Sequence, residues 1–175
     1  MTGFAQTGDY LLVLNCFESM QKEGLQPDEV SFLSLLIACS QKGLVDEGCM
    51  NFKLMRDEHG LTPSIMHYNT MVDLLGHARF LNEVEDLLET IPFSRNLVGW
   101  TSLLTSCKTH LNVEIGRRSF DNFSVLNCGN ATGYVLMWNI YSQTNMLEEA
   151  EEIEELRKYA NAWKMPGKAF IEIGD

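Results

Sequence analysis

The residues in this sequence that could carry hydrolytic or metal chemistry are its four histidines and five cysteines. A zinc-activated water that attacks a nucleobase needs an H-x-E motif and a distant C-x-x-C pair. The four histidine motifs are His59-Gly-Leu, His67-Tyr-Asn, His77-Ala-Arg and His110-Leu-Asn, and no two cysteines have the C-x-x-C spacing. The chain lacks the residues for that site, and we expect it to be no enzyme.

Cys107 and His110 are three residues apart and could share one face of a helix. As a metal-binding or nucleophilic pair they lack a third ligand or an orienting acid nearby, so a core cysteine and a helix-end histidine are the simpler interpretation. No glycine-rich phosphate loop and no nucleophile elbow is present. We therefore expect no cofactor, no bound metal and no small-molecule substrate.

The cysteine count and the net charge exclude two further classes. An odd number of cysteines without paired spacing predicts reduced, mostly buried thiols rather than a disulfide framework: Cys16, Cys39, Cys49, Cys107 and Cys128. The formal net charge of −11 argues against a protein that holds nucleic acid mainly through phosphates, because such proteins are usually basic. If this chain contacts RNA, it does so through the bases, weakly, or as part of a longer protein.

No stretch reaches the roughly 18 consecutive apolar residues that a membrane-spanning helix needs. The N-terminus also lacks the basic-then-apolar pattern of a targeting peptide. We expect no membrane contact, and any organelle address must lie outside this chain.

The sequence repeats itself. Three pairs of like residues recur 36 positions apart: Gly24 and Gly60, Pro27 and Pro63, Phe32 and Tyr68. Two more pairs recur at a spacing of 35: Phe17 with Phe52, and Met20 with Met55. A period of this length, with two helical stretches per unit, predicts an array of helix-turn-helix units that bury their apolar faces against their neighbours.

The apolar pattern places two helices in each unit. Phe32, Leu35, Leu36 and Cys39 have the spacing of one apolar stripe, and Gly43 is expected to end that helix in a left-handed conformation. Proline breaks the chain between units at positions 27 and 63. A small residue recurs in the second helix of three units, where we expect the two helices of a unit to approach closely: Gly48, Gly116 and Ala150.

The last helix is strongly acidic. Its expected core stripe is Leu147, Ala150, Ile153 and Leu156. Six glutamates cover the rest of that helix: Glu148, Glu149, Glu151, Glu152, Glu154 and Glu155. This surface is either a solvated outer face or one that repels phosphate and binds a basic protein, in which case Glu148, Glu149, Glu152 and Glu155 are the expected contacts.

These features resemble the C-terminal part of a plant pentatricopeptide repeat protein of the PLS subclass. "PDEVSFLSLLIACSQKGLVDEGCMNFKLM" (27–55) is similar to a long-type repeat, and "HYNTMVDLLGHARFLNEVEDLLETIP" (67–92) to a short-type repeat. "GWTSLLTSCKTHLNVEIGRR" (99–118) resembles the start of the E-type extension. "GYVLMWNIYSQTNMLEEAEEIEELRK" (133–158) and "KMPGKAFIEI" (164–173) resemble its second half. The chain departs from the family pattern at Leu111, where a small residue or glycine is usual.

The resemblance implies an all-α, right-handed superhelical solenoid with a short non-helical C-terminal tail. Residues 1–96 would be the repeats: 1–28 incomplete, 29–64 long type and 65–96 short type. Residues 97–175 would be the E-type extension, with two tetratricopeptide-like helix pairs followed by the tail. No DYW deaminase domain is expected within the chain.

The resemblance also implies recognition of single-stranded RNA in a mitochondrion or chloroplast, usually for C-to-U editing. Each repeat of the family reads one base through the fifth residue of its first helix and the last residue of the unit. These positions are Asn69 and Asn96 in the third unit, and Leu33 and Ser64 in the second. Asp28 alone remains of the first. The asparagines could instead serve as caps or turn residues, and Leu33 cannot make a hydrogen bond.

Three functions remain open from the sequence. The first is a non-catalytic RNA-recognition and adaptor module whose acidic helix recruits a deaminase or an editing cofactor protein in trans. The second is a tetratricopeptide-like scaffold for protein interactions, which the acidity favours. The third is a truncated, inactive copy.

Overall fold

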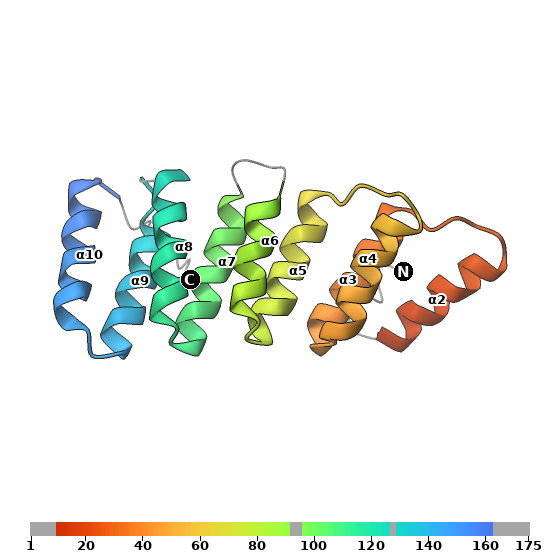
Figure 1. Cartoon of the computed structure of the whole chain (residues 1–175), viewed down its shortest axis with the longest axis horizontal. Helices are drawn as coiled ribbons and strands as arrows, with labels where there is room; N and C mark the ends of the chain where they lie inside the picture. The colour runs from red at the N-terminus through yellow and green to blue at the C-terminus, as the bar shows by residue number, and fades with distance from the viewer. Residues whose placement is uncertain (1–9, 92–95, 127–128, 163–175) are drawn as a thin grey trace, which may run out of the picture.

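A computed structural model describes residues 10–91, 96–126 and 129–162, and in these ranges the chain is all-α. The described helices are α2 (Tyr10–Lys22), α3 (Glu29–Lys42), α4 (Val45–Asp57), α5 (Ile65–His77), α6 (Leu81–Thr90), α7 (Leu97–His110), α8 (Val113–Leu126), α9 (Ala131–Gln143) and α10 (Leu147–Tyr159). They stand side by side in one elongated row, in chain order (Figure 1). The predicted all-α solenoid is confirmed. The predicted non-helical tail, Cys128 and the start of the first unit lie outside the described residues.

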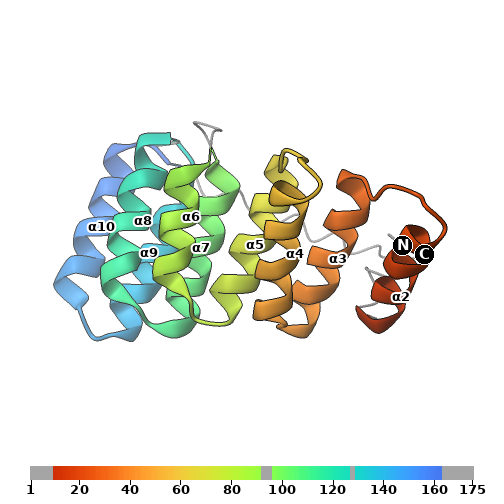
Figure 2. The ribbon, with the colours of Figure 1, turned by 45° about the vertical axis from the view of Figure 1, so that its right-hand side comes forward.

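The helices form two layers. α3, α5, α7 and α9 each pack against the second helix of their own pair, which is α4, α6, α8 and α10 respectively. Successive first helices also contact one another along the row, whereas among the second helices only α6 and α8 do (Figure 2). Because the first helices stand closer together, the row bends toward their layer. We call the surface of α3, α5, α7 and α9 the concave face.

The first complete pair shows why the sequence forms these helices. Asp28 caps α3, since its side chain accepts the backbone N–H of Ser31 at 2.8 Å. Gly43 ends α3 with φ 68°, and its N–H bonds the carbonyls of the last turn, as the sequence predicts. The predicted apolar stripe of this helix is completely buried: Phe32, Leu35, Leu36 and Cys39.

Two glycines in the second helices allow close packing. The Cβ of any residue replacing Gly48 would overlap the side chain of Leu74 in α5, and it would lie 3.6 Å from the Cβ of Cys39. A Cβ at Gly116 would lie 3.0 Å from Ile140 and 3.5 Å from the Cβ of Cys107. The predicted close approach of the two helices within a pair is therefore present. The shorter contacts of both glycines, however, are to side chains of the next pair along the row, Leu74 and Ile140.

Two histidines connect successive pairs through backbone carbonyls. His67 Nε2 lies 2.9 Å from the carbonyl oxygen of Glu29. His110 Nε2 lies 3.0 Å from the carbonyl oxygen of Gly76, while its Nδ1 accepts a hydrogen bond from Arg79 Nε at 3.0 Å. Because Nδ1 of His110 accepts, its Nε2 carries the proton and donates to the preceding pair. Both ring nitrogens of His110 are thus engaged within the fold.

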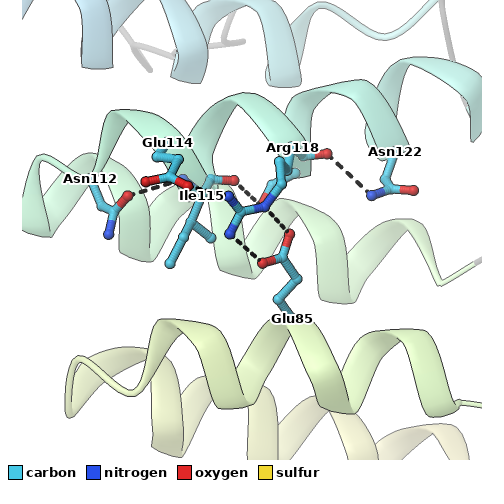
Figure 3. Close-up of polar contacts among 7 residues, drawn as sticks. Glu85, Asn112, Glu114, Ile115, Arg118 and Asn122 are labelled. Carbon is cyan, nitrogen blue, oxygen red and sulfur yellow. Dashed lines mark hydrogen bonds and ion pairs between the residues drawn. The ribbon is translucent and has the colours of Figure 1, made fainter.

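A charged contact joins α6 to α8 (Figure 3). Arg118 donates from Nε and Nη2 to the two carboxylate oxygens of Glu85, at 2.8 and 2.7 Å. Its Nη1 also donates to Glu114, one turn earlier in α8, at 2.9 Å. The hydrogen bond to Glu85 is the main cause that raises the pKa of the Arg118 guanidinium. Planar forked pairs of this kind are among the stronger charged contacts in proteins.

The thiols follow the sequence prediction in part. Cys39 and Cys107 are fully buried, and burial raises the pKa of Cys39 to about 11 and that of Cys107 to about 12. Cys16 is half-buried, but Cys49 is exposed, contrary to the expectation of buried thiols. Within the described ranges, no three histidine, cysteine or acidic side chains gather in a way that could hold a metal ion.

The core stripe expected for α10 is half wrong. Ala150 and Ile153 are buried, but Leu147 and Leu156 are exposed. The position of Leu156 is not a core position in the earlier second helices either, because Leu54 is half-buried and Thr90 and Asn122 are exposed. None of the described helices is long and apolar enough to cross a membrane.

Candidate nucleic-acid interface

Asn69 and Asn96, predicted to act as a pair, are hydrogen-bonded to each other between the pairs that begin with α5 and α7. Asn69 is the fifth residue of α5, and Asn96 directly precedes α7. Asn96 Nδ2 donates a hydrogen bond to Asn69 Oδ1 at 3.0 Å. Asn96 is only 6% exposed, whereas Asn69 is half-buried. Asn69 is therefore the member of the pair that a ligand in the groove can reach.

The orientation of both amides follows from one backbone contact. Asn96 caps α7, and its Oδ1 accepts the backbone N–H of Gly99 at 3.0 Å. Its Nδ2 must then face Asn69, so the atom of Asn69 that faces it must be the acceptor, Oδ1. Among the described residues, none accepts a hydrogen bond from Asn69 Nδ2. We call the two successive hydrogen bonds, from Gly99 to Asn96 and from Asn96 to Asn69, the amide relay. The amide relay leaves the Nδ2 donor of Asn69 available to a ligand.

Gly99 makes room for this relay. The Cβ of a larger residue there would overlap the Asn96 amide on one side and Leu88 on the other. The capping interpretation of Asn96 is thus correct in geometry. Capping also sets which atom the neighbouring Asn69 presents.

Ser64 and Asp28, the last residues of the second and first units, also cap helices. Ser64 begins α5, where its Oγ and its backbone N–H both meet His67 Nδ1, at 2.8 and 3.2 Å. Asp28 is exposed and accepts hydrogen bonds from the backbone and the hydroxyl of Ser31, which together hold the pKa of its carboxyl below the usual range. Leu33, the fifth residue of α3, is half-buried and apolar. The second unit therefore presents no amide pair like that of Asn69 and Asn96.

The structure adds a row of residues that the sequence reasoning missed. The second residue of each of three first helices is a large apolar side chain, 54–60% exposed: Val30, Met66 and Val98. Each lies three residues before a fifth-position residue and so on the same side of its helix. The sequence could have revealed them, because each is an apolar residue at the same position of its helix and outside the apolar stripe that forms the core. Exposed apolar groups beside a polar donor suit the flat faces of unstacked bases.

The concave face carries few positive charges. Of the four first helices, α5 and α9 have no lysine or arginine, and the lysines of the other two lie in their last turns: Lys42 and Lys108. Asp73, one turn after Asn69, is exposed. Phosphate contacts on this face are therefore limited to its edges.

The acidic helix α10 presents its glutamates away from the row. Glu148, Glu152 and Glu155 are exposed, and Glu149 is half-buried. Glu152 and Glu155 line a shallow groove together with two exposed side chains, Leu156 and Tyr159. The surface combines negative charge with apolar area.

Comparisons with known families match this architecture. Models described as the pentatricopeptide repeat domain and the PPR repeat match residues 1–42, 20–78 and 66–92. A model described as the E motif matches residues 110–172. The repeat matches cover α5, the helix that carries Asn69, and the E-motif match includes α8 to α10.

Curated relatives from Arabidopsis thaliana cover nearly the whole chain. One pentatricopeptide repeat-containing protein is 38% identical over 174 residues, which are 99% of this chain and 32% of the relative. Another, named chloroplastic, is 35% identical over 100% of this chain and 21% of its own length. A third, named mitochondrial, is 36% identical over 100% of this chain and 23% of its own length. The chain thus spans between a fifth and a third of the length of these relatives.

Proposed function

This chain belongs to the pentatricopeptide repeat family and carries its E motif, and we propose that it is a non-catalytic RNA-recognition and adaptor module. The observation that carries the proposal is the pair of hydrogen bonds by which buried Asn96 occupies the side-chain oxygen of Asn69. In our proposal the remaining Nδ2 of Asn69 is the donor that meets the RNA base. A groove of helical repeats with one such donor per repeat can read one base at a time.

Recognition at the third unit proceeds through Asn69 Nδ2. It donates to an acceptor on the Watson–Crick edge of a pyrimidine, while the exposed side chains of Met66 and Val98 contact the two faces of the base. The family resemblance supports a pyrimidine preference for an asparagine pair. The second unit discriminates poorly, because Leu33 offers no hydrogen bond and Ser64 is engaged with His67.

The adaptor role belongs to the E-motif part of the chain. The acidic surface of α10, with Glu148, Glu149, Glu152 and Glu155, attracts a basic protein by charge complementarity and repels the RNA backbone. In this proposal such a partner supplies the deaminase or editing-cofactor activity in trans. Relatives named chloroplastic and mitochondrial support an organellar RNA as target.

The experiment that tests the RNA assignment uses the full chain and short labelled single-stranded RNAs that differ at one position. We expect weak binding by fluorescence anisotropy, a preference for pyrimidine over purine at one position, and a shallow salt dependence of the affinity, because few cations line the concave face. Equal binding of all four bases at every position would contradict the assignment, and so would tight nanomolar binding by this chain alone.

A protein-interaction scaffold is the second candidate, and the net charge of −11 favours it. The two functions differ in the face they use. Substitutions at Asn69 should change RNA selectivity without changing protein capture, whereas charge reversal on α10 should do the opposite. Protein capture without any RNA selectivity would favour the scaffold.

A further inference from the structure

The eighth residue of the first helices changes character in the last described pair. Leu36 in α3, Val72 in α5 and Leu104 in α7 hold this position, and each is completely buried. Trp138 holds the same position in α9, yet it is 42% exposed. A large aromatic ring is therefore accessible where aliphatic side chains form the core of the earlier pairs.

Trp138 lines a cavity together with four other described residues. Val135 and Asn139 come from α9, and Glu154 and Arg157 come from α10. The cavity has a volume of about 450 Å³ and is partly open to solvent. Binding pockets for small ligands have volumes of roughly 300–1,000 Å³, so this one has room for a flat ring of the size of a nucleobase. We call it the end cavity.

The end cavity continues the row of fifth-position residues on the concave face. The fifth residues of α3, α5, α7 and α9 are Leu33, Asn69, Thr101 and Val135. Val135 also lines the end cavity. Asn139 lies one turn after Val135, on the same side of α9. A strand that follows the fifth positions past Asn69 and Thr101 therefore reaches the end cavity at Val135.

One polar group in the end cavity has a fixed orientation. Asn139 is half-buried, and its Nδ2 donates to the backbone carbonyl oxygen of Val135 at 2.7 Å. A carbonyl oxygen can only accept, so the atom of Asn139 that faces it must be Nδ2 and not Oδ1. Among the described residues, none donates a hydrogen bond to Asn139 Oδ1. That oxygen is left to accept an N–H from a ligand.

A charged pair supplies hydrogen-bond donors on the other wall. Arg157 donates from Nε and Nη2 to the two carboxylate oxygens of Glu154, at 2.8 and 2.6 Å. Its Nη1 donates to the carbonyl oxygen of Ala162 at 2.9 Å. These contacts hold the guanidinium in place and leave the second N–H of each Nη atom for a ligand. Because Glu154 balances the positive charge, this wall suits a neutral ligand better than a phosphate.

An unstacked nucleobase combines the features that these walls select. Its flat face can stack on the indole of Trp138, and stacking of this kind tolerates every base because each has a π-face. An N–H at its edge can donate to Asn139 Oδ1, and a ring or carbonyl acceptor can receive an N–H of Arg157. An aliphatic helix would instead leave the amide and the charged pair covered without polar partners.

We propose that the end cavity binds one further base of the same single-stranded RNA, stacked on Trp138 and hydrogen-bonded by Asn139 and Arg157. The inference rests on the proposed RNA recognition and extends it two helix pairs beyond Asn69, into the E-motif part of the chain. The site accepts all four bases, because stacking supplies most of its affinity. It needs no phosphate contact, and α9 has no lysine or arginine to make one.

The test measures the fluorescence of Trp138 in the full 175-residue chain carrying Trp163→Phe, where the nearly buried Trp100 is the other tryptophan. The probe is a short oligocytidylate, chosen for the pyrimidine preference proposed at Asn69. A base stacked on an indole quenches its emission, so we expect quenching that saturates together with the anisotropy signal for RNA binding. Trp138→Leu, with the residue of α3 and α7 at this position, should weaken binding about tenfold, and Trp138→Phe should weaken it less because it keeps a ring.

The matched control moves the exposed indole by combining Phe80→Trp with Trp138→Phe, since Phe80 is also 42% exposed but lies at the start of α6. Circular dichroism first shows that each variant keeps its helical fold, and no quenching is expected at position 80. Equal quenching at both positions would overturn this inference alone. So would unquenched Trp138 in a chain whose base preference still depends on Asn69.

Two further outcomes concern the identity of the ligand. An emission change of Trp138 with an added basic peptide but not with RNA would assign the end cavity to a protein and overturn the inference. No RNA binding by the unsubstituted chain would overturn it together with the proposed RNA recognition.

Discussion

Asn96 and Asn69 are joined by a 3.0 Å hydrogen bond that runs in one direction only, from the buried amide to the accessible one. The direction is set by the backbone N–H of Gly99, which occupies Asn96 Oδ1. A helix cap in one pair therefore determines the atom that the preceding pair presents to the groove. The predictions at these two positions follow from this relay.

At Asn69, the alanine and aspartate variants should separate stability from recognition. Asn69→Ala removes the acceptor of a nearly buried N–H of Asn96 and should lower the free energy of unfolding by about 1 kcal/mol. Asn69→Asp keeps an acceptor but lacks the Nδ2 donor, so it should fold nearly as well and lose the pyrimidine preference. Thermal unfolding and RNA anisotropy measure the two effects. Retained base preference in Asn69→Asp would show that this donor reads no base.

At Asn96, aspartate should change the base that is preferred. Asn96→Asp still caps α7, but the new carboxylate only accepts, so the Asn69 amide must turn and direct Oδ1 into the groove. N3 is an acceptor in cytosine and a donor in uracil, so preference should move from cytosine toward uracil. Asn96→Ala is the control: it loses the cap, about 1 kcal/mol of stability, and the ordering of Asn69. An unchanged cytosine-to-uracil ratio in Asn96→Asp would refute the relay as the source of selectivity.

Glycine at position 111, directly after α7, should make the protein more stable. Leu111 adopts a left-handed conformation with φ 55°, which costs a non-glycine residue about 1–2 kcal/mol. Leu111→Gly should raise the free energy of unfolding by about 0.5–1 kcal/mol, after allowing for the greater freedom of glycine in the unfolded chain. Asn145→Gly, at φ 59°, is the control and should gain less, because asparagine tolerates this conformation. Chemical denaturation measures both, and equal gains would contradict the explanation.

The forked contact between α6 and α8 should stabilise the row more than its neighbour does (Figure 3). The side chain of Glu85 is 13% exposed, whereas that of Glu114 is 86% exposed, and both bind Arg118. Glu85→Gln should therefore lower the melting temperature more than Glu114→Gln, because burial reduces solvent screening. The comparison is repeated at high salt, where the smaller of the two effects should disappear first. Equal losses would mean that the contact between pairs adds nothing beyond the one inside α8.

Stability should fall in alkali because of the buried thiols. The pKa of Cys107 rises from an ordinary 9.0 to about 12, so above pH 9 the unfolded chain loses this proton while the folded chain keeps it. The contribution of Cys107 is fully present below pH 9 and declines as the pH rises toward 12. By pH 11, two pH units above the pKa of the unfolded chain, the loss amounts to about 2.7 kcal/mol. Cys107→Ala should flatten the fall between pH 9 and 11, and Cys49→Ala should flatten it by less, because the Cys49 thiol is exposed and the desolvation that raises its pKa is only partial.

The helix pairs could be predicted because their signals are local. The stripe from Phe32 to Cys39 and the glycine at position 43 act within a few residues of where they stand. What failed depends on distant neighbours. Leu147 and Leu156 have core spacing but stay exposed, because burial depends on which neighbouring helix covers that side, and the spacing alone does not reveal this. The pairing of Asn69 with Asn96 was expected from the family. Which amide donates the hydrogen bond depends on the backbone N–H of Gly99, a contact that the sequence does not reveal.

The positions proposed to read bases at the ends of the units all begin helices: Asp28 starts α3, Ser64 starts α5 and Asn96 starts α7. Only a few side chains can begin a helix well, chiefly those of aspartate, asparagine, serine and threonine. Evolution toward a new RNA target is therefore confined to a few amino acids at these sites. A bulky or long cationic residue there would shorten the next helix before it could alter which nucleotide is bound.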